Sequence, residues 1–154
     1  ENIPANILAL QNCIRDYGEA GADVLKFHLL VVTGVMCGIR GAESMEGSLF
    51  MNNHNATNLL LCIRHLQHLK LREPEEIYWS YISARGRPMG ISPRLGLEFF
   101  ALSRLACITR AVGSEWEALT MVWDTLSSND RHMLTEYFLS DGIQTSAIIF
   151  EYLP

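Results

Sequence analysis

The sequence lacks the patterns that mark several large classes of protein. It has only 4 cysteines and 5 prolines in 154 residues, and its 11 glycines follow no triplet period. These counts exclude a disulfide scaffold and a collagen-like chain. No heptad run and no repeat of fixed length occurs, so coiled coils and solenoids are excluded as well. Because 49% of the residues are hydrophobic and only 19% are charged, the chain can bury a core, and intrinsic disorder is also excluded.

Motifs of nucleotide binding and of catalysis are missing too. There is no Gly-x-x-x-x-Gly-Lys-Ser/Thr loop and no Gly-x-Gly-x-x-Gly pattern, which excludes nucleotide binding by those two devices. No Gly-x-Ser-x-Gly turn presents a nucleophilic serine. Nothing in the sequence therefore indicates an enzyme, and we expect neither catalytic residues nor a cofactor.

Four residues are weak candidates for metal ligands: His54, Cys62, His65 and His68. On a helix Cys62 and His65 are neighbours, as are His65 and His68, but Cys62 and His68 point about 120° apart. Their spacing matches no zinc pattern, which favours solvent-facing histidines without a metal. The least favoured functional hypothesis is a metal-dependent hydrolase that uses His54, His65 and Glu46.

Lysine is scarce, and charge is unevenly distributed. Ten of the twelve basic residues are arginine, and the net charge is −5. Residues 85–110 carry five arginines against one acid, a local charge of +4, whereas residues 114–154 carry seven acids against one arginine, a local charge of −6. Regions of opposite sign on one chain permit contacts between copies, so we expect a homo-oligomer.

The segment from Arg85 to Arg94 is the strongest candidate for a binding site. It contains three arginines, two glycines and two prolines, and it leads into the predicted start of a helix. Free amides at a helix start and nearby guanidinium groups together form an anion site, and aromatic rings just upstream could stack bases. The candidate residues for binding an anion or a partner are Arg85, Arg87, Arg94, Arg104, Arg110, Trp79 and Tyr81.

Three hypotheses follow from this segment. In the first, the chain is a non-enzymatic helical interaction domain that mediates protein–protein contact or self-assembly through its Arg-rich loop. In the second, it is an RNA-binding, nucleocapsid-type helical lobe in which the same arginines contact the phosphates of single-stranded RNA. In the third, the arginines pair with the acidic C-terminal third of their own chain. Local charge alone does not separate these hypotheses.

The spacing of apolar residues predicts an all-α bundle of about seven helices with no significant sheet. Residues 22–39 are apolar almost all round, which predicts a central, buried helix. Ser114 and Glu117 predict a capping box at the start of the helix near 115–127. Thr57 or Asn58 is the expected cap of the helix that starts near residue 59. The predicted helices lie near residues 4–17, 22–39, 59–69, 74–84, 93–112, 115–127 and 129–141, with an eighth in 143–153.

The four cysteines and the chain ends bear on location and domain organisation. Each cysteine lies in or beside an apolar stretch with no partner nearby in sequence, which is typical of reduced core cysteines and predicts an intracellular protein, cytoplasmic or nuclear. The apolar run at 24–39 carries Lys26 and His28 and is shorter than a span of about 20 residues, so we expect no membrane segment and no membrane partner. We expect residues 1–154 to form a single all-α domain excised from a longer chain.

Overall fold

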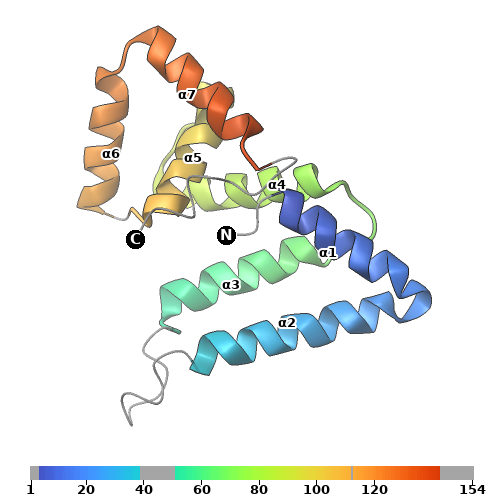
Figure 1. The fold of residues 1–154 in the computed structure, drawn as a ribbon. Helices are drawn as coiled ribbons and strands as arrows, with labels where there is room; N and C mark the ends of the chain where they lie inside the picture. Colours follow the sequence, from blue (N-terminus) through green and yellow to red (C-terminus); the bar gives the residue numbers. More distant parts are fainter. Residues whose placement is uncertain (1–3, 39–50, 112, 143–154) are drawn as a thin grey trace. The chain divides into compact units, whose positions relative to one another are not determined.

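The computed structural model describes residues 4–38, 51–111 and 113–142 (Figure 1). These residues form seven α-helices and no strand, which confirms the all-α prediction. Three short 3-10 turns lie between the helices: η1 (Gly18–Ala20), η2 (Arg87–Met89) and η3 (Pro93–Leu95). The predicted eighth helix lies outside the described residues. The helices are α1 (Pro4–Asp16), α2 (Gly21–Gly38), α3 (Asn53–Leu66), α4 (Pro74–Gly86), α5 (Leu97–Thr109), α6 (Ser114–Thr125) and α7 (Ser128–Ser140).

The contacts of the chain divide it into two compact units. Unit 1 comprises residues 1–7 and 74–154, and unit 2 comprises residues 8–73. Within unit 1, the backbone N–H of Ala5 donates to the carbonyl of Gly142 at 2.9 Å, which ties the start of α1 to the residues after α7. Within unit 2, the buried side-chain amide of Gln11 donates to the carbonyls of Leu69 at 2.6 Å and Arg72 at 3.0 Å. A single domain over 1–154 stays a prediction.

Helix α5 is the central helix of unit 1. It packs against both α4 and α7 (Figure 1), and six of its thirteen residues are buried. Its apolar side chains meet residues from the preceding segment and from the two later helices, so burial of apolar surface stabilises all of these elements together. The buried cluster consists of Ile91, Phe99, Ala101, Leu102, Trp123 and Phe138.

Helix α2, the most apolar helix, is not buried in unit 2, so the prediction of a central position was wrong. Only Gly21 and Leu25 of its 18 residues are buried. The side chains of Phe27 and Leu30 are 68% and 70% exposed. Apolar composition indicates that a helix needs an apolar cover, but it does not say which molecule supplies that cover.

Helix starts differ from the predicted ones because nearby polar residues compete for the cap. Asn52 caps α3, since its side chain accepts from the backbone N–H of Asn55 at 2.9 Å. Thr57 lies inside that helix and is not its cap. The N-cap of α6 is Gly113, with a φ of 56° and no side-chain cap hydrogen bond, and Ser114 lies inside the helix, so the predicted capping box was wrong. Ser127 caps α7 by accepting from the N–H of Asp130 at 3.1 Å.

The four cysteines are thiols, but they are not core residues as predicted. Cys13 and Cys37 are exposed, and Cys62 and Cys107 are partly buried. Apolar neighbours in sequence do not ensure that a cysteine is buried, because α1 and α2 both expose apolar side chains to solvent. An intracellular location stays a prediction.

Candidate functional site

The stretch 87–97, which is the connection between α4 and α5 together with the first residue of α5, is folded rather than irregular. We call it the 87–97 segment. Gly90, with a φ of 79°, closes η2 in the left-handed region that glycine adopts without strain. Ser92 caps η3, because its Oγ accepts from the N–H of Arg94 at 3.3 Å. Between the two turns Ile91 is buried in the core cluster of unit 1, so the segment is anchored at its middle.

Two of the predicted arginines lie exposed on this segment. Arg87 and Arg94 are both exposed, and neither forms an ion pair with any residue that the structure describes. Leu95 and Leu97 are exposed beside Arg94. The sequence analysis missed these two leucines, because they fell within the predicted helix 93–112. The surface of the segment therefore combines two cations with aliphatic side chains.

The aromatic candidates and Arg85 are used for packing within unit 1. The Nη1 of Arg85 donates to the hydroxyl of Tyr81 at 2.9 Å, and the guanidinium carbon lies 5.8 Å from the centre of that ring. The ring of Trp79 lies edge-on to those of Tyr78 and Phe100, at centroid distances of 4.8 Å and 5.6 Å. Edge-on aromatic pairs of this kind stabilise packing. The structure therefore gives these rings an internal role.

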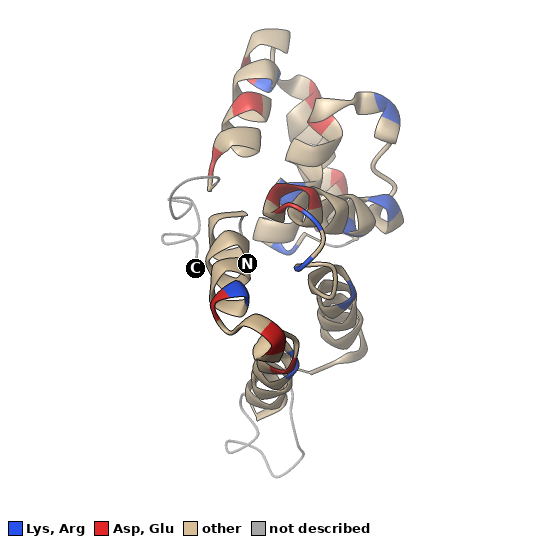
Figure 2. Cartoon of the chain, turned by 90° about the vertical axis from the view of Figure 1, so that its right-hand side faces the viewer, with Lys and Arg blue, Asp and Glu red and all other residues tan. Residues whose placement is uncertain are grey.

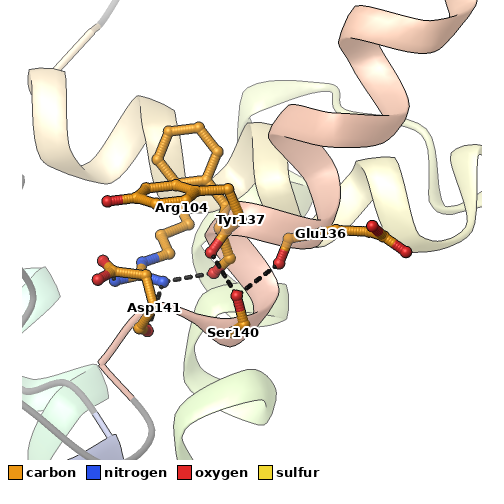
Figure 3. A network of polar contacts seen from close by, with 6 residues as sticks. Arg104, Glu136, Tyr137, Ser140 and Asp141 are labelled. Carbon is orange, nitrogen blue, oxygen red and sulfur yellow. Dashed lines mark hydrogen bonds and ion pairs between the residues drawn. The ribbon is translucent and has the colours of Figure 1, made fainter.

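Arg104 is fully buried and pairs with residues at the end of α7 (Figure 3). Its Nη2 donates to Oδ2 of Asp141 at 2.8 Å. Its Nη1 donates to the carbonyl of Asp141 at 2.9 Å and to the carbonyl of Phe138. The rings of Tyr78 and Phe138 lie about its guanidinium carbon, at 5.8 Å and 6.0 Å from their centres. The guanidinium thus satisfies the carbonyl of Phe138 in the last turn of α7, where carbonyls have no partner within the helix, and the carbonyl of Asp141 just after it.

The assignment of Arg104 to a partner-binding surface is therefore corrected. Its side chain has no exposed surface, so no partner can reach it in the folded chain. The intramolecular hypothesis holds for this one arginine, which pairs with Asp141 of the acidic C-terminal third. Sequence reasoning missed this because Arg104 lies 37 residues from Asp141, and nothing local marks the pair.

Arg110 lies at the far end of α5 from the 87–97 segment. It caps the C-terminus of that helix with a φ of 53°, and its side chain is exposed. Thirteen residues of α-helix are about 20 Å long, which is twice the distance of about 8–10 Å over which physiological salt screens a charge. Arg110 and Arg94 therefore do not act as one cationic surface.

The start of α5 already holds a carboxylate of the chain itself. Glu98 lies in the first turn. Its Oε2 accepts from the indole Nε1 of Trp123 at 3.1 Å and lies 4.0 Å from Nε of Arg131. A carboxylate in the first turn offsets the positive end of the helix dipole and repels a second anion. The predicted contribution of the α5 amides to an anion site is therefore not supported.

The candidate metal ligands lie on or just after α3 in unit 2. His54 and His68 are exposed, and Cys62 and His65 are partly buried. Among the residues that the structure describes, no group of three or more His, Cys, Asp or Glu side chains could hold a metal ion. Figure 2 marks the charged residues on the part of the chain that the structure describes.

Burial lowers the pKa of His65 below the ordinary value of 6.5, and the charges of His68 and Arg72 lower it further. The folded chain then binds this proton more weakly than the unfolded chain does, so the free energy of unfolding should fall as the pH drops through 6.5. We expect an NMR titration to place the midpoint of His65 below 6.5. We also expect His65→Gln to reduce the loss of stability between pH 7 and pH 5. A midpoint at or above 6.5 would contradict the expectation.

No protein family, no curated protein and no solved structure matches the chain.

Proposed function

We propose that the chain is a non-enzymatic helical interaction domain that binds an acidic region of a protein partner through the 87–97 segment. The observation that carries this proposal is the exposure of Arg87 and Arg94 on a segment whose backbone is held in place. A guanidinium group can bind a carboxylate through two parallel hydrogen bonds. Arginine is also enriched in protein–protein interfaces.

The fixed backbone supports the proposal because it lowers the entropic cost of binding. Ile91 anchors the segment in the core of unit 1. On the η3 side, the N–H of Leu95 donates to the carbonyl of Ser92 at 3.1 Å. On the η2 side, the N–H of Gly90 donates to the carbonyl of Arg87 at 3.1 Å. A segment that is already ordered loses little freedom when a partner binds.

The side chains around the arginines favour a protein over single-stranded RNA. Proteins that bind single strands use aromatic rings on which bases stack. The rings of Trp79 and Tyr81 already pack within unit 1. The exposed neighbours of Arg94 are instead Leu95 and Leu97, which suit the apolar side chains that lie between the acids of a protein partner.

The test measures binding of two probes by fluorescence anisotropy: a peptide of alternating glutamate and leucine pairs, and a 20-nucleotide uridine oligomer. We expect the chain to bind the peptide more tightly than the RNA. We expect the double variant Arg87→Ala/Arg94→Ala to weaken peptide binding about tenfold or more, since hydrogen bonds between charged groups contribute about 1.5–3 kcal/mol each.

The matched control is Arg15→Ala/Arg64→Ala, which removes two exposed arginines from unit 2. Equal loss of binding in the two double variants would mean that net charge and not the 87–97 segment recognises the peptide. Tighter binding of the RNA would favour the nucleic-acid hypothesis, with an affinity that falls linearly with salt on logarithmic axes.

A further inference from the structure

The outward face of α2 is the largest apolar feature that the proposed function leaves unused. By length and composition η1 and α2 together, Gly18–Gly38, could cross a membrane: an 18-residue window of this stretch has a mean hydropathy of 1.5, yet only 11% of that window is buried. A helix that is apolar all round is covered either by a protein core or by lipid. The described residues of the chain supply little of that cover.

Four of the exposed residues of α2 lie in one row along the helix. Phe27, Leu30, Val31 and Gly34 recur at steps of three and four, which places them in one row. The side chains of Phe27, Leu30 and Val31 are exposed, and so is the backbone of Gly34. A Cβ atom added at Gly34 would meet nothing within 4 Å, so nothing in the described chain covers the middle of the row. We call these four residues the α2 face.

A charged pair at one end of the α2 face indicates what covers it. Lys26 Nζ lies 2.8 Å from Asp23 Oδ1 on the first turns of α2, and both side chains are more than three-quarters exposed. The hydrogen bond from Lys26 lowers the pKa of Asp23 below 3.8, so Asp23 is a carboxylate at neutral pH. The helical period places them on the side of Phe27 and Leu30. Insertion of this side into lipid would carry both charges into hydrocarbon, which is costly.

We propose that the α2 face binds the same face of a second copy of the chain, with the two helices parallel. An interface with two-fold symmetry must be complementary to itself, and the pair of one acid and one base meets this condition. In a parallel pair the charged ends meet each other and the apolar ends meet each other. In an antiparallel pair Asp23 and Lys26 would instead face the apolar end of the partner helix. The absence of a side chain at Gly34 lets the two backbones approach closely at the middle of the pair.

The first test measures the mass of the 154-residue chain by sedimentation equilibrium over a range of concentrations. One helix face lies at the small end of the size range of specific interfaces, so we expect a reversible dimer with a dissociation constant of about 1–100 μM. Leu30→Glu should weaken the dimer about 100-fold, because each copy then buries a carboxylate among the apolar side chains of the interface. The matched control is Leu71→Glu, which places the same charge on an 85% exposed leucine outside α2. It should leave the dimer unchanged.

A second variant separates loss of the dimer from loss of folding. Lysine forms helix better than glycine does, so Gly34→Lys should not reduce the helical circular dichroism signal of the monomer. It should still prevent dimerisation, because it places two charges at the middle of the pair. A chain that remains monomeric at all concentrations overturns the proposal. So does a dimer that survives both Leu30→Glu and Gly34→Lys.

Thiol cross-linking tests the parallel arrangement. Cys37 lies near the C-terminal end of α2 and is exposed, as is Cys13 on α1. A short bis-maleimide should join two chains through Cys37, so Cys37→Ser should abolish the cross-linked dimer and Cys13→Ser should preserve it. The opposite dependence overturns the parallel pair.

Vesicles and the arginine variant complete the test. Flotation with phosphatidylcholine–phosphatidylserine vesicles that is lost in Leu30→Glu would show that lipid covers the α2 face, which overturns the proposal.

Arg87→Ala/Arg94→Ala should not change the dimer, because those residues belong to unit 1 and α2 belongs to unit 2. A failure of the proposed binding to an acidic partner is therefore distinguishable from a failure of the proposed dimer.

Discussion

Replacing Arg104 with alanine is expected to lower the free energy of unfolding by about 3–5 kcal/mol, the usual cost of removing one member of a buried ion pair. The variant leaves the carboxylate of Asp141 without its partner in a site where that side chain is only 9% exposed. It also leaves the carbonyls of Phe138 and Asp141 without the donor that they share. Small domains are stable by only about 5–15 kcal/mol, so the variant should be close to unfolding. Urea denaturation followed by circular dichroism measures the change.

Two further variants show whether the loss comes from this pair. Arg94→Ala removes an arginine from an exposed site and should change the stability by less than about 0.5 kcal/mol. Asp141→Asn should be costly in the natural chain, but it should cost little in the Arg104→Ala background, where no cation remains to be paired. If Arg104→Ala costs no more than Arg94→Ala, the buried network does not contribute as the geometry indicates.

Replacing Gly86 with alanine is expected to lower the free energy of unfolding by about 2 kcal/mol, within the usual range for overpacking a core. The residue ends α4 where this helix meets α5. A Cβ atom there would lie 2.0 Å from Oγ and 2.8 Å from Cβ of Ser103, and 3.3 Å from the ring of Phe99. Alanine forms helix better than glycine by about 1 kcal/mol. Helix propensity alone would therefore predict that Gly86→Ala stabilises the chain, which is the opposite of the expected result.

A compensating change tests the steric explanation. Ser103→Gly removes both atoms that the new Cβ would meet most closely, although it also removes the hydrogen bond that Ser103 Oγ donates to the carbonyl of Phe99 at 2.6 Å. We expect a double-mutant cycle of Gly86→Ala with Ser103→Gly to show a favourable coupling of about 1 kcal/mol or more. Additive effects would indicate that α4 and α5 do not approach as closely as described.

The fold class and most helices could be predicted from the order of residues alone. Apolar side chains at steps of three and four define a helix without reference to the rest of the chain, so α1 and α4 lie close to their predicted ranges. Their prolines mark the first helical turn for a local reason, because proline lacks the backbone N–H that has no partner there.

The residue that caps a helix was less predictable. Asn52 and Thr57 can both accept a hydrogen bond from a backbone amide, and only the folded chain shows that Asn52 does so.

The candidate site was predicted only in part. Arg87 and Arg94 are exposed as expected, since a segment rich in glycine and proline runs over the surface. Arg104 was assigned to the same surface, but it is buried. Its partner Asp141 lies 37 residues further along the chain, so no local pattern indicates the pair. Local charge indicates how many arginines a region holds. It does not indicate which of them finds a carboxylate inside the protein.

Residue order thus defines where this chain is helical, because the hydrogen bonds of a helix join residues four apart and its apolar row repeats within two turns. Tertiary packing decides which helix is covered. α2 and α5 are both strongly apolar, yet α5 lies in the core of unit 1 and α2 keeps most of its side chains exposed. The physical reason is that burial depends on contacts between residues far apart in sequence, and the apolar pattern of a helix is the same whether or not those contacts form.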